Sequence, residues 1–401
     1  MAITQLPPLS LYIHFPWCVQ KCPYCDFNSH AIKQPIPEEE YIDALLFDLE
    51  QELPSVWGRS LTSIFIGGGT PSLMSSESMQ KLLSGIRSLL PFIDIETTME
   101  ANPGTVEAEK FNGFFEAGVN RISIGVQSFN NDFLSTLGRI HSSDEAVNAF
   151  KIARKAGFEN INIDLMYALP NQSIQQAIGD LKIATELKPE HLSWYQLTLE
   201  PNTAFYHKPP ANMIADDLLA DINDEGLKYL KDKNYHRYEV SAFSLSGENP
   251  AWHNTNYWQF GDYLGIGAGA HGKITRADNQ QVIRTSKRRN PKDYLNKDKS
   301  FLDQTRVLQT QELPLEFMMN AMRLKNGIPE ELFFQTTGLL ISQLNQVLRK
   351  LVSRDLITHK DNIIKPTELG FRFLNDILSE FSAENFPNLD NSNKIDFREL
   401  T

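Results

Sequence analysis

Cysteine is scarce in this chain: its 401 residues include only three, and all of them lie within one stretch of eight. An odd number of cysteines argues against the disulfide framework that holds small secreted domains together. Basic residues are also outnumbered, since 38 Lys and Arg stand against 50 Asp and Glu, for a formal net charge of −12. Non-specific binding to nucleic acid depends on clustered Lys and Arg, so the composition predicts no nucleic-acid partner.

Long apolar runs are absent as well. No uninterrupted apolar stretch is long enough to span a bilayer, and residues 1–11 lack the basic segment and apolar core of a signal peptide. We therefore expect a cytoplasmic protein without a transmembrane segment, in a compartment that keeps thiols reduced. With 41% hydrophobic residues over 401 positions, the chain is long enough for two or three domains with hydrophobic cores.

The three cysteines form a C-x3-C-x2-C cluster made of Cys18, Cys22 and Cys25. Thiolates suit iron–sulfur clusters, and a loop this short is able to wrap one [4Fe–4S] cube while its fourth iron stays without a cysteine. Such an open iron binds a small molecule and passes it an electron. The alternative is a closed tetrahedral zinc site with a fourth protein ligand. Candidates for that fourth ligand are His14, His30 and Asp26.

Residues 8–200 alternate short β-rich runs with longer amphipathic helical patterns, which is typical of βα units around a parallel sheet. Six such units predict an α/β fold, a partial (β/α)6 barrel of the TIM type, whose chemistry gathers where strands end. The predicted strands are Leu9–Phe15, Ser63–Gly67, Glu96–Ala101, Arg121–Val126, Asn160–Met166 and His191–Thr198. The predicted helices are Glu38–Gln51, Ser76–Leu89, Val106–Ala117, Asp144–Ala156 and Ile174–Leu187.

Polar and glycine-rich segments follow these strands. The second strand runs into Gly67–Thr70, and the next three place Glu100, Gln127 and Asp164 near their ends. Three consecutive glycines exceed what a tight turn needs, which predicts that a ligand approaches bare backbone amides there. Each polar side chain alone is equally explained as a satisfied group at a barrel rim. Together they predict a ligand that carries an amine and ribose hydroxyls.

The second half of the chain changes character. The basic run Arg284–Arg289 is interpreted as a solvated loop. Further on, helix-rich sequence ends in two short strand patterns, Asp355–Thr358 and Ile363–Pro366, which predict a compact winged-helix-like module without DNA binding. The predicted organisation is a barrel with an extension over 1–275, a linker over 276–305, a smaller helical, winged-helix-like C-terminal domain over 306–383 and a poorly ordered polar tail over 384–401.

These motifs resemble the radical S-adenosylmethionine (SAM) proteins of the coproporphyrinogen-oxidase-like group. The resemblance covers nearly the entire chain and implies that the three cysteines bind a [4Fe–4S] cluster, whose fourth iron SAM chelates through its amino and carboxylate groups. It also implies one-electron cleavage of SAM to a 5′-deoxyadenosyl radical, which an enclosed barrel mouth protects. It is carried by Tyr12–Trp17, the GGGTP segment, the Glu100 strand end, Gly125–Phe129 and Asp164–Pro170. The positions implied to line the SAM site are Tyr12, Tyr24, Gly68, Gly69, Thr70, Glu100, Gln127, Arg139 and Asp164.

Two branches of this group differ in function. The oxygen-independent decarboxylase that makes protoporphyrinogen has a further cysteine two residues past the third cluster cysteine, where this chain has Phe27, and a longer segment before the position of Tyr12. The heme-chaperone branch carries an H-N-x-x-Y-W motif, matched here by His253–Trp258. We therefore expect a heme chaperone that delivers heme to apoproteins such as respiratory-chain enzymes, some of them membrane-associated. Decarboxylation of coproporphyrinogen is the alternative.

Heme binding is expected at this second motif. A neutral imidazole from His253 is able to ligate heme iron, and Tyr257 and Trp258 offer flat apolar faces to the macrocycle. The chaperone branch often has a cysteine two residues before the histidine; Ala251 stands there in this chain, which excludes a thiolate at that position. The alternative for His253 is a histidine hydrogen-bonded in a turn beside core aromatics. The sequence leaves open the oligomeric state and whether radical cleavage of SAM takes part in turnover.

Overall fold

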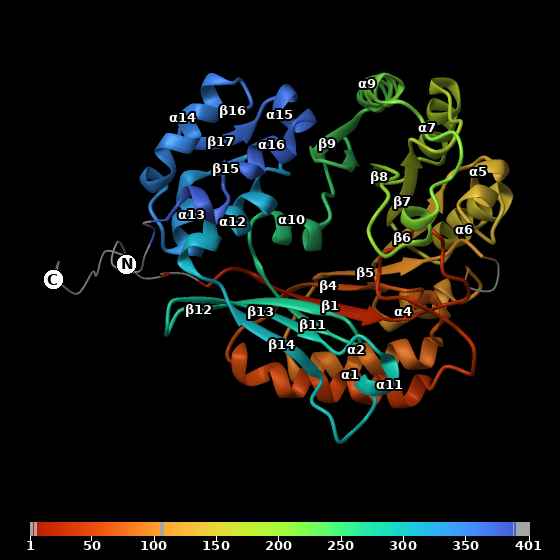
Figure 1. Cartoon of the computed structure of the whole chain (residues 1–401). Helices are drawn as coiled ribbons and strands as arrows, with labels where there is room; N and C mark the ends of the chain where they lie inside the picture. The colour runs from red at the N-terminus through yellow and green to blue at the C-terminus, as the bar shows by residue number, and fades with distance from the viewer. Residues whose placement is uncertain (1–2, 4–5, 105–107, 388, 390–401) are drawn as a thin grey trace.

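The structure is a computed structural model, which describes residues 3, 6–104, 108–387 and 389. Twelve strands of the described residues form one curved sheet in the order β14-β13-β12-β11-β1-β4-β5-β6-β7-β8-β10-β9 (Figure 1). Its six central strands are parallel and follow one another in chain order, which confirms the predicted partial (β/α)6 barrel. These strands are β1 (Leu9–Phe15), β4 (Leu61–Gly68), β5 (Glu96–Ala101), β6 (Arg121–Gln127), β7 (Asn160–Tyr167) and β8 (His191–Gln196).

Several of the helices that connect these strands start or stop at recognisable caps. Ser75 accepts a hydrogen bond from the Ser78 amide at the start of α2, and Ser142 begins α6 with a capping box. At the other end, α4 stops at Gly118 in the left-handed conformation. The predicted start of α4 near Val106 falls on residues outside those described. The helices are α1 (Glu38–Glu52), α2 (Ser76–Leu89), α4 (Phe111–Ala117), α5 (Asn131–Thr136), α6 (Ser143–Lys155) and α7 (Ile174–Leu187).

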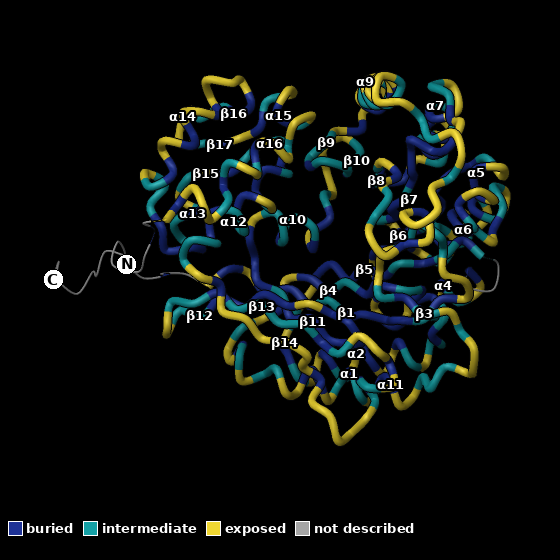
Figure 2. Tube along the Cα trace, in the orientation of Figure 1, coloured by how far each residue is buried: buried dark blue, intermediate teal, exposed yellow. Residues whose placement is uncertain are grey.

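The barrel strands turn alternate residues to opposite sides, as a pleated strand requires. On β6, Ile122, Ile124 and Val126 are buried in the main hydrophobic core, which lies between the sheet and the helices outside it. The alternate residues Ser123, Gly125 and Gln127 face the interior of the barrel. Figure 2 shows this buried layer along the sheet, with exposed segments mainly in the outer loops. The two-residue alternation of the strand side chains therefore gives the barrel sheet a packed apolar outer face and a polar inner face.

An antiparallel extension continues the sheet beyond β1. Strand β11 (Asp262–Ile266) pairs in parallel with β1, and β12 (His271–Arg276), β13 (Gln281–Lys287) and β14 (Leu302–Val307) follow as antiparallel neighbours. The prediction of a linker over 276–305 is therefore wrong, because β13 and most of β14 lie in that segment. The prediction of a solvated loop is wrong for Arg284–Lys287, which belong to β13, whereas Arg289 follows the strand and is exposed. These outer strands are rich in polar residues, so their sequences lack the alternation of apolar and polar residues that predicts a strand. A short helix, α11 (Pro291–Tyr294), connects β13 to β14.

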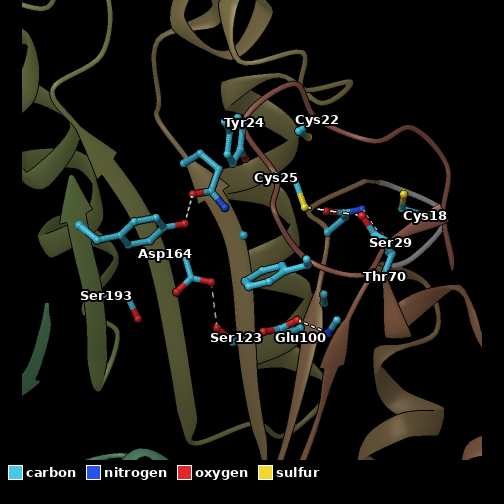
Figure 3. A pocket seen from close by; sticks show the side chains of 18 of the residues that line it. Cys18, Cys22, Tyr24, Cys25, Ser29, Thr70, Glu100, Ser123, Asp164 and Ser193 are labelled. Carbon is cyan, nitrogen blue, oxygen red and sulfur yellow. Dashed lines mark hydrogen bonds between the residues drawn. The ribbon is translucent and has the colours of Figure 1, made fainter. Parts of the chain in front are cut away.

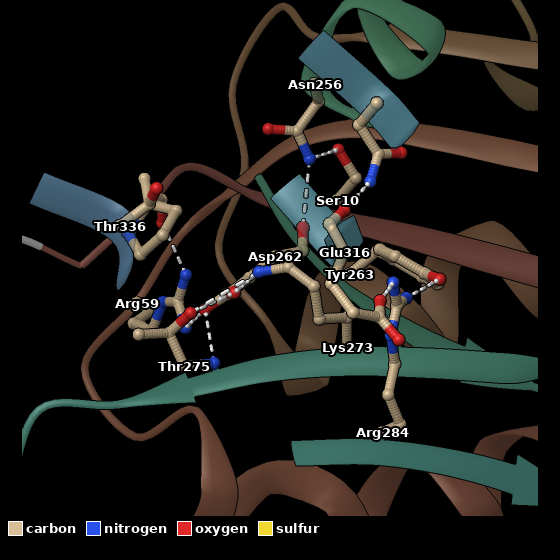
Figure 4. Close-up of polar contacts among 12 residues, drawn as sticks. Ser10, Arg59, Asn256, Asp262, Tyr263, Lys273, Thr275, Arg284, Glu316 and Thr336 are labelled. Atoms are coloured by element: carbon tan, nitrogen blue, oxygen red, sulfur yellow. Dashed lines mark hydrogen bonds and ion pairs between the residues drawn. The ribbon is translucent and has the colours of Figure 1, made fainter. Parts of the chain in front are cut away.

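Buried ion pairs hold the extension against the barrel. Lys287 is almost fully buried and contacts Asp48 and Glu52 of α1, each at 2.5 Å. In β11, the buried Asp262 carboxylate contacts Lys273 and Arg59, both at 2.8 Å (Figure 4). Burial by itself would raise the pKa of Asp262, but the two cations hold it below its usual value. Lys273 and Lys287 therefore serve packing inside the fold.

The far edge of the sheet and the floor of the barrel come from residues after β8. Strand β10 (Ala242–Leu245) pairs antiparallel with β8, and β9 (Tyr235–Glu239) forms the edge. Helix α10 (Trp252–Trp258) carries the H-N-x-x-Y-W motif and contacts β1, β4 and β11. Its first two amides donate to the Glu96 carboxylate at the start of β5. Helix α10 therefore closes the amino end of the barrel. Two further helices precede β9, namely α8 (Ala204–His207) and α9 (Asp216–Asp232).

The C-terminal domain has its own hydrophobic core and a three-stranded sheet in the order β15-β17-β16. Phe260 and Val282 of the barrel part join this core, so the domain packs directly on the extension. Of the two strands predicted for the wing, Ile363–Pro366 is confirmed, whereas the strand predicted over Asp355–Thr358 lies two residues further on, at Ile357–Lys360. The elements are α12 (Leu313–Ala321), β15 (Ile328–Pro329), α13 (Glu330–Thr337), α14 (Asn345–Ser353), β16 (Ile357–Lys360), β17 (Ile363–Pro366), α15 (Glu368–Arg372) and α16 (Leu374–Ser379).

Most of the predicted polar tail, 384–401, lies outside the described residues, although Phe386 and Leu389 are described and buried in the second core. Across the part of the chain that the structure describes, no helix combines the length and apolar character needed to cross a bilayer.

Candidate functional site

A cavity of about 510 Å³ opens at the carboxyl ends of the barrel strands and reaches inward to α10 (Figure 3). Most of the residues predicted for a site come together here, from five strands and from the loops that follow them. The predicted residues that line the cavity are Cys18, Cys22, Tyr24, Cys25, Gly68, Gly69, Thr70, Glu100, Gln127, Arg139 and Asp164. Tyr12 and His253 do not line it.

The cysteine loop is pinned at both of its ends. A short parallel pair, β2 (Trp17–Cys18) with β3 (His30–Ala31), fixes where the loop leaves and rejoins the barrel. Within the loop, the Cys25 amide donates to the Cys22 carbonyl at 3.1 Å, which makes a tight turn. Burial raises the pKa of the Cys18 and Cys25 thiols. The thiols are thus held at the cavity by local backbone structure.

The cysteines fit a [4Fe–4S] cluster better than a single zinc ion. They present three soft sulfur donors from one loop to one cavity, and thiolates that bind different irons need not meet at one point. Across the described ranges, no three His, Cys, Asp or Glu side chains are placed to hold one metal ion. His14, a candidate zinc ligand, already bonds Tyr12 Oη at 2.8 Å and the Asn28 carbonyl at 3.0 Å. A closed zinc site is therefore not preformed.

The glycine run brings the end of β4 against the segment that leads to Cys18. A Cβ added to Gly68, whose φ is +111°, would lie 2.4 Å from the His14 ring, and one on Gly69 would lie 2.4 Å from the Trp17 carbonyl. The expectation of bare amides is wrong for these two glycines. The Gly68 amide donates to Glu100 at 3.0 Å, and the Gly69 amide donates to the Phe15 carbonyl at 2.6 Å. The glycines serve close packing beside the cavity.

Two carboxyl groups make the inner wall of the cavity acidic. Burial raises the pKa of Glu100 to about 7; the Gly68 amide offsets part of this, and the nearby Asp164 adds to it. Asp164 accepts hydrogen bonds from Ser123 Oγ at 3.0 Å and Asn162 Nδ2 at 2.7 Å, and burial raises its pKa as well. A cationic or hydroxyl-bearing ligand would relieve this arrangement, because it supplies the partners that buried carboxylates need.

A buried guanidinium faces the cysteine loop from the other side. Arg139 donates to the Gly125 carbonyl at 2.7 Å and to Asn102 Oδ1 at 2.9 Å, and its Nη1 lies 3.7 Å from Cys22 Sγ. Its Nε is buried without a hydrogen-bond partner among the described residues. An arginine with a spare donor is suited to a carboxylate ligand. The cavity therefore offers anionic and cationic contacts at different places.

Gln127 ends β6 in a strained conformation. Its φ is +72°, which non-glycine residues rarely adopt, and the pairing of β6 with β7 shifts at this point. The side-chain oxygen accepts a hydrogen bond from Tyr195 Oη at 2.7 Å. This bulge aims Gln127 into the cavity.

Several cavity residues escaped the sequence predictions. Ser123 on β6 and Ser193 and Tyr195 on β8 were detectable, because they fall on the inward positions of their strands. Glu239 and Arg323, which form an ion pair at 3.1 Å, had no local signal because they lie 84 positions apart. Asn102 was also missed, whereas Asn254 and Trp258 belong to the H-N-x-x-Y-W motif expected at the heme and line the first cavity instead.

The two remaining predicted residues lie elsewhere. Tyr12 faces a second cavity. His253 is fully buried, with Nε2 2.8 Å from Tyr257 Oη and Nδ1 3.2 Å from Ser63 Oγ, and its ring stacks on Phe65. Burial lowers its pKa to about 3. This environment matches the alternative expected from the sequence, a hydrogen-bonded histidine beside core aromatics, except that His253 lies on α10 and not in a turn. Neither nitrogen is open to heme iron in this conformation.

The barrel, the cysteine loop and the cavity define a radical SAM protein. The profile of the radical SAM superfamily matches residues 12–183, and that of the HemN C-terminal domain matches residues 308–373. Within this class the chain belongs to the HemW family. It is 49% identical over 383 residues to the heme chaperone HemW of Escherichia coli (strain K12), which covers 95% of this chain and 100% of the relative. It is 48% identical over 385 residues to the heme chaperone HemW of Haemophilus influenzae, with 95% and 99% covered.

A more distant relative supports the fold across both domains. The solved structure of coproporphyrinogen III oxidase (HemN) from Escherichia coli, a radical SAM enzyme, aligns with a TM-score of 0.80 and covers 95% of this chain and 92% of its own. At 23% identity this likeness concerns the fold alone.

Proposed function

We propose that this protein is a heme chaperone that carries a [4Fe–4S] cluster and SAM, binds heme at a separate place and delivers it to apoproteins, among them membrane-associated respiratory-chain enzymes. The observation that carries the proposal is near full-length identity of 49% to a protein named as a heme chaperone, together with the cavity that unites the cluster cysteines with the predicted SAM residues. We also propose that the protein acts in the cytoplasm.

Different residues of the first cavity would bind the cluster and SAM. Cys18, Cys22 and Cys25 hold three irons of the cluster. Bound together, the cluster and SAM supply one-electron chemistry at the sulfonium. The chain would orient SAM through side chains of opposite charge, with Glu100 accepting a hydrogen bond from the iron-bound amino group and Arg139 donating to the carboxylate.

The sugar and base of SAM have their own contacts in this proposal. Asp164 and Gln127 lie on neighbouring strands and accept hydrogen bonds in the cavity, which suits the ribose hydroxyls. Thr70 stands at the rim beside Gly68 and Gly69, where Asn102 donates to its hydroxyl at 3.1 Å. Tyr24 provides a flat wall near the cysteine loop. The cavity extends from these residues inward to α10. A ligand that fills the cavity would therefore displace water from the interior of the barrel.

Phe27 favours chaperone function over decarboxylation. It occupies the place of the further cysteine expected in the decarboxylase branch, so no fourth thiol follows Cys25. Its side chain is 57% exposed and lies between the cluster cavity and the second cavity, both of which it lines. An exposed aromatic ring at this junction suits contact with a planar apolar ligand.

The test compares transfer and catalysis in parallel. The protein is reconstituted anaerobically with iron and sulfide, loaded with hemin and mixed with membranes from heme-starved cells, with an equal amount of free hemin as the control. We expect faster recovery of quinol-oxidase activity than with free hemin. The same preparation is incubated with coproporphyrinogen III, SAM and a reductant. Decarboxylated product at catalytic rates, or recovery no faster than with free hemin, would overturn the proposal.

A further inference from the structure

A second cavity, of about 680 Å³, lies behind the cysteine loop and beside the antiparallel extension. Its lining includes Phe27 just after Cys25, Tyr257 of α10, Tyr263 of β11 and His271 of β12. Its volume falls in the range of about 300–1,000 Å³ that is typical of pockets for small molecules and cofactors. Because His271 and the residues of β14 are exposed, a ligand reaches this cavity from outside without passing through the cluster cavity.

Two histidines line this cavity, His14 and His271, and of these two His271 is the one with open nitrogens among the described residues. Both ring nitrogens of His14 are hydrogen-bonded within the chain, and so are both nitrogens of His253. The side chain of His271 makes no hydrogen bond or ion pair with any described residue, while its backbone is fixed by pairing with Ser286. Burial lowers the pKa of His271, and Arg284 and Arg289 add to this effect.

The aromatic walls of the cavity are held in place by their hydroxyl groups. The rings of Tyr257 and Tyr263 pack edge to face with centroids 4.4 Å apart. Tyr257 Oη bonds His253 Nε2 at 2.8 Å, and Tyr263 Oη accepts from Arg284 Nη1 at 2.8 Å (Figure 4). Because both hydroxyl groups are hydrogen-bonded, the two rings are held in place and offer a fixed apolar surface for a planar macrocycle.

The charges around the cavity orient an anionic ligand. Arg289 lines it, is exposed, and makes no ion pair or side-chain hydrogen bond with any described residue. Asp26 and Asp303 also line the cavity and would repel carboxylates. The propionates of a heme therefore fit on the side of Arg289, where a free guanidinium is able to bind a carboxylate by two hydrogen bonds.

We propose that heme occupies this second cavity, with His271 as its axial ligand, Arg289 on a propionate, and Tyr257, Tyr263 and Phe27 against the macrocycle. The proposal rests on the heme binding proposed above and assigns its site. The H-N-x-x-Y-W helix then contributes Tyr257 to the wall, and His253 acts as a positioning residue that holds the Tyr257 hydroxyl. Heme lies next to the cysteine loop without occupying the SAM cavity.

The experiment uses hemin as the probe and the full chain with its cluster reconstituted anaerobically. In His271→Ala, we expect a shifted Soret band, an altered ferric spin state by electron paramagnetic resonance, and hemin affinity reduced about tenfold or more, since losing even an outer partner of a metal ligand costs about 10–100-fold. The matched control is His236→Ala, an exposed histidine on β9 at the far edge of the sheet. It should match the wild type. Iron, sulfide and SAM binding should be unchanged in both variants.

The outcomes separate this inference from the proposed function. If the wild type binds one hemin but His271→Ala keeps its spectrum and affinity, the assignment of the site is overturned while heme binding stands. A Soret shift confined to His253→Ala would equally overturn it and return ligation to His253. If the wild type shows no saturable hemin binding, the proposed function itself fails. Because the His271 side chain is exposed, the variant should fold; a retained melting temperature verifies this.

Discussion

Replacing Glu100 by Gln should stabilise the SAM-free protein and weaken its binding of SAM. In the folded chain the pKa of this carboxyl is raised from 4.5 to about 7, chiefly by burial. At about 1.4 kcal/mol per pKa unit, ionising the group inside the barrel costs about 3 kcal/mol. Glu100→Gln keeps the shape and the acceptor for the Gly68 amide but has no charge to bury.

The sign of the pH dependence follows from linkage. Below pH 4.5 the carboxyl is protonated in the folded and the unfolded chain, so the wild type loses no stability through it. As the pH rises from 4.5 to about 7, the unfolded chain releases the proton first, and the folded state becomes progressively less stable. The advantage of Glu100→Gln should therefore be small at pH 5 and approach about 3 kcal/mol at pH 8.

Urea unfolding of the cluster-free chain at pH 5 and pH 8 measures this difference, with Glu159→Gln, an exposed carboxyl, as the control. SAM affinity is then measured by calorimetry on the reconstituted protein. For the wild type, affinity should rise about tenfold from pH 6 to pH 8, because the ionised carboxyl is the better acceptor for the SAM amino group and is attracted to the sulfonium charge. Glu100→Gln should bind more weakly and without this dependence. A variant that is less stable at pH 8, or that binds SAM as the wild type does, would refute the reasoning.

Three further changes have definite expected results. Cys22→Ser should lose iron and sulfide while keeping the far-UV circular dichroism of the barrel; wild-type iron and sulfide would remove Cys22 from the ligand set. Lys287→Met leaves Asp48 buried without its cation and should cost about 3–5 kcal/mol in urea unfolding. The exposed Lys292→Met should change stability by less than about 0.5 kcal/mol, and equal effects would contradict the buried pair. Gly68→Ala combines a φ of +111° with a 2.4 Å clash, so it should lower SAM affinity and cost at least about 1–3 kcal/mol, and an unchanged melting temperature would contradict this.

The barrel was predictable because its signals are local. The two-residue period of the strands and the caps of the helices lie within short windows of sequence. The third strand was predicted as Glu96–Ala101 and is found there. The second, predicted as Ser63–Gly67, extends over Leu61–Gly68 because pairing with its neighbours recruits flanking residues that show no pattern of their own.

The extension was missed because its determinants are distant in sequence. From its neighbours in the sequence, Lys287 is expected to lie in a basic loop. In the fold it contacts Asp48 of α1, which is 239 positions away in the sequence. In the same way, the burial of His253 depends on Ser63 of β4, 190 positions away. Such partners leave no trace in the sequence around either residue. Charge patterning therefore suggested solvent exposure for Lys287, and for His253 the sequence left a hydrogen-bonded core histidine open as the alternative to a heme ligand.

The candidate site was predictable to the extent that strand ends and family motifs mark it. Glu100, Gln127 and Asp164 were expected from their places at strand ends, and all three line the first cavity. Tyr12 was assigned to the same set but faces the second cavity, since its position on β1 turns it toward α10 and β11. Sequence resemblance identified the residue types that matter, whereas their division between two cavities needed the fold.

The most direct test of two separate sites is hemin titration of the anaerobically reconstituted chain in the presence of saturating SAM, with bound heme, iron, sulfide and SAM all quantified. The account predicts one heme per chain at saturation, with cluster content and bound SAM unchanged throughout the titration. Displacement of SAM by hemin, or loss of the cluster as heme binds, would show a shared site and contradict it.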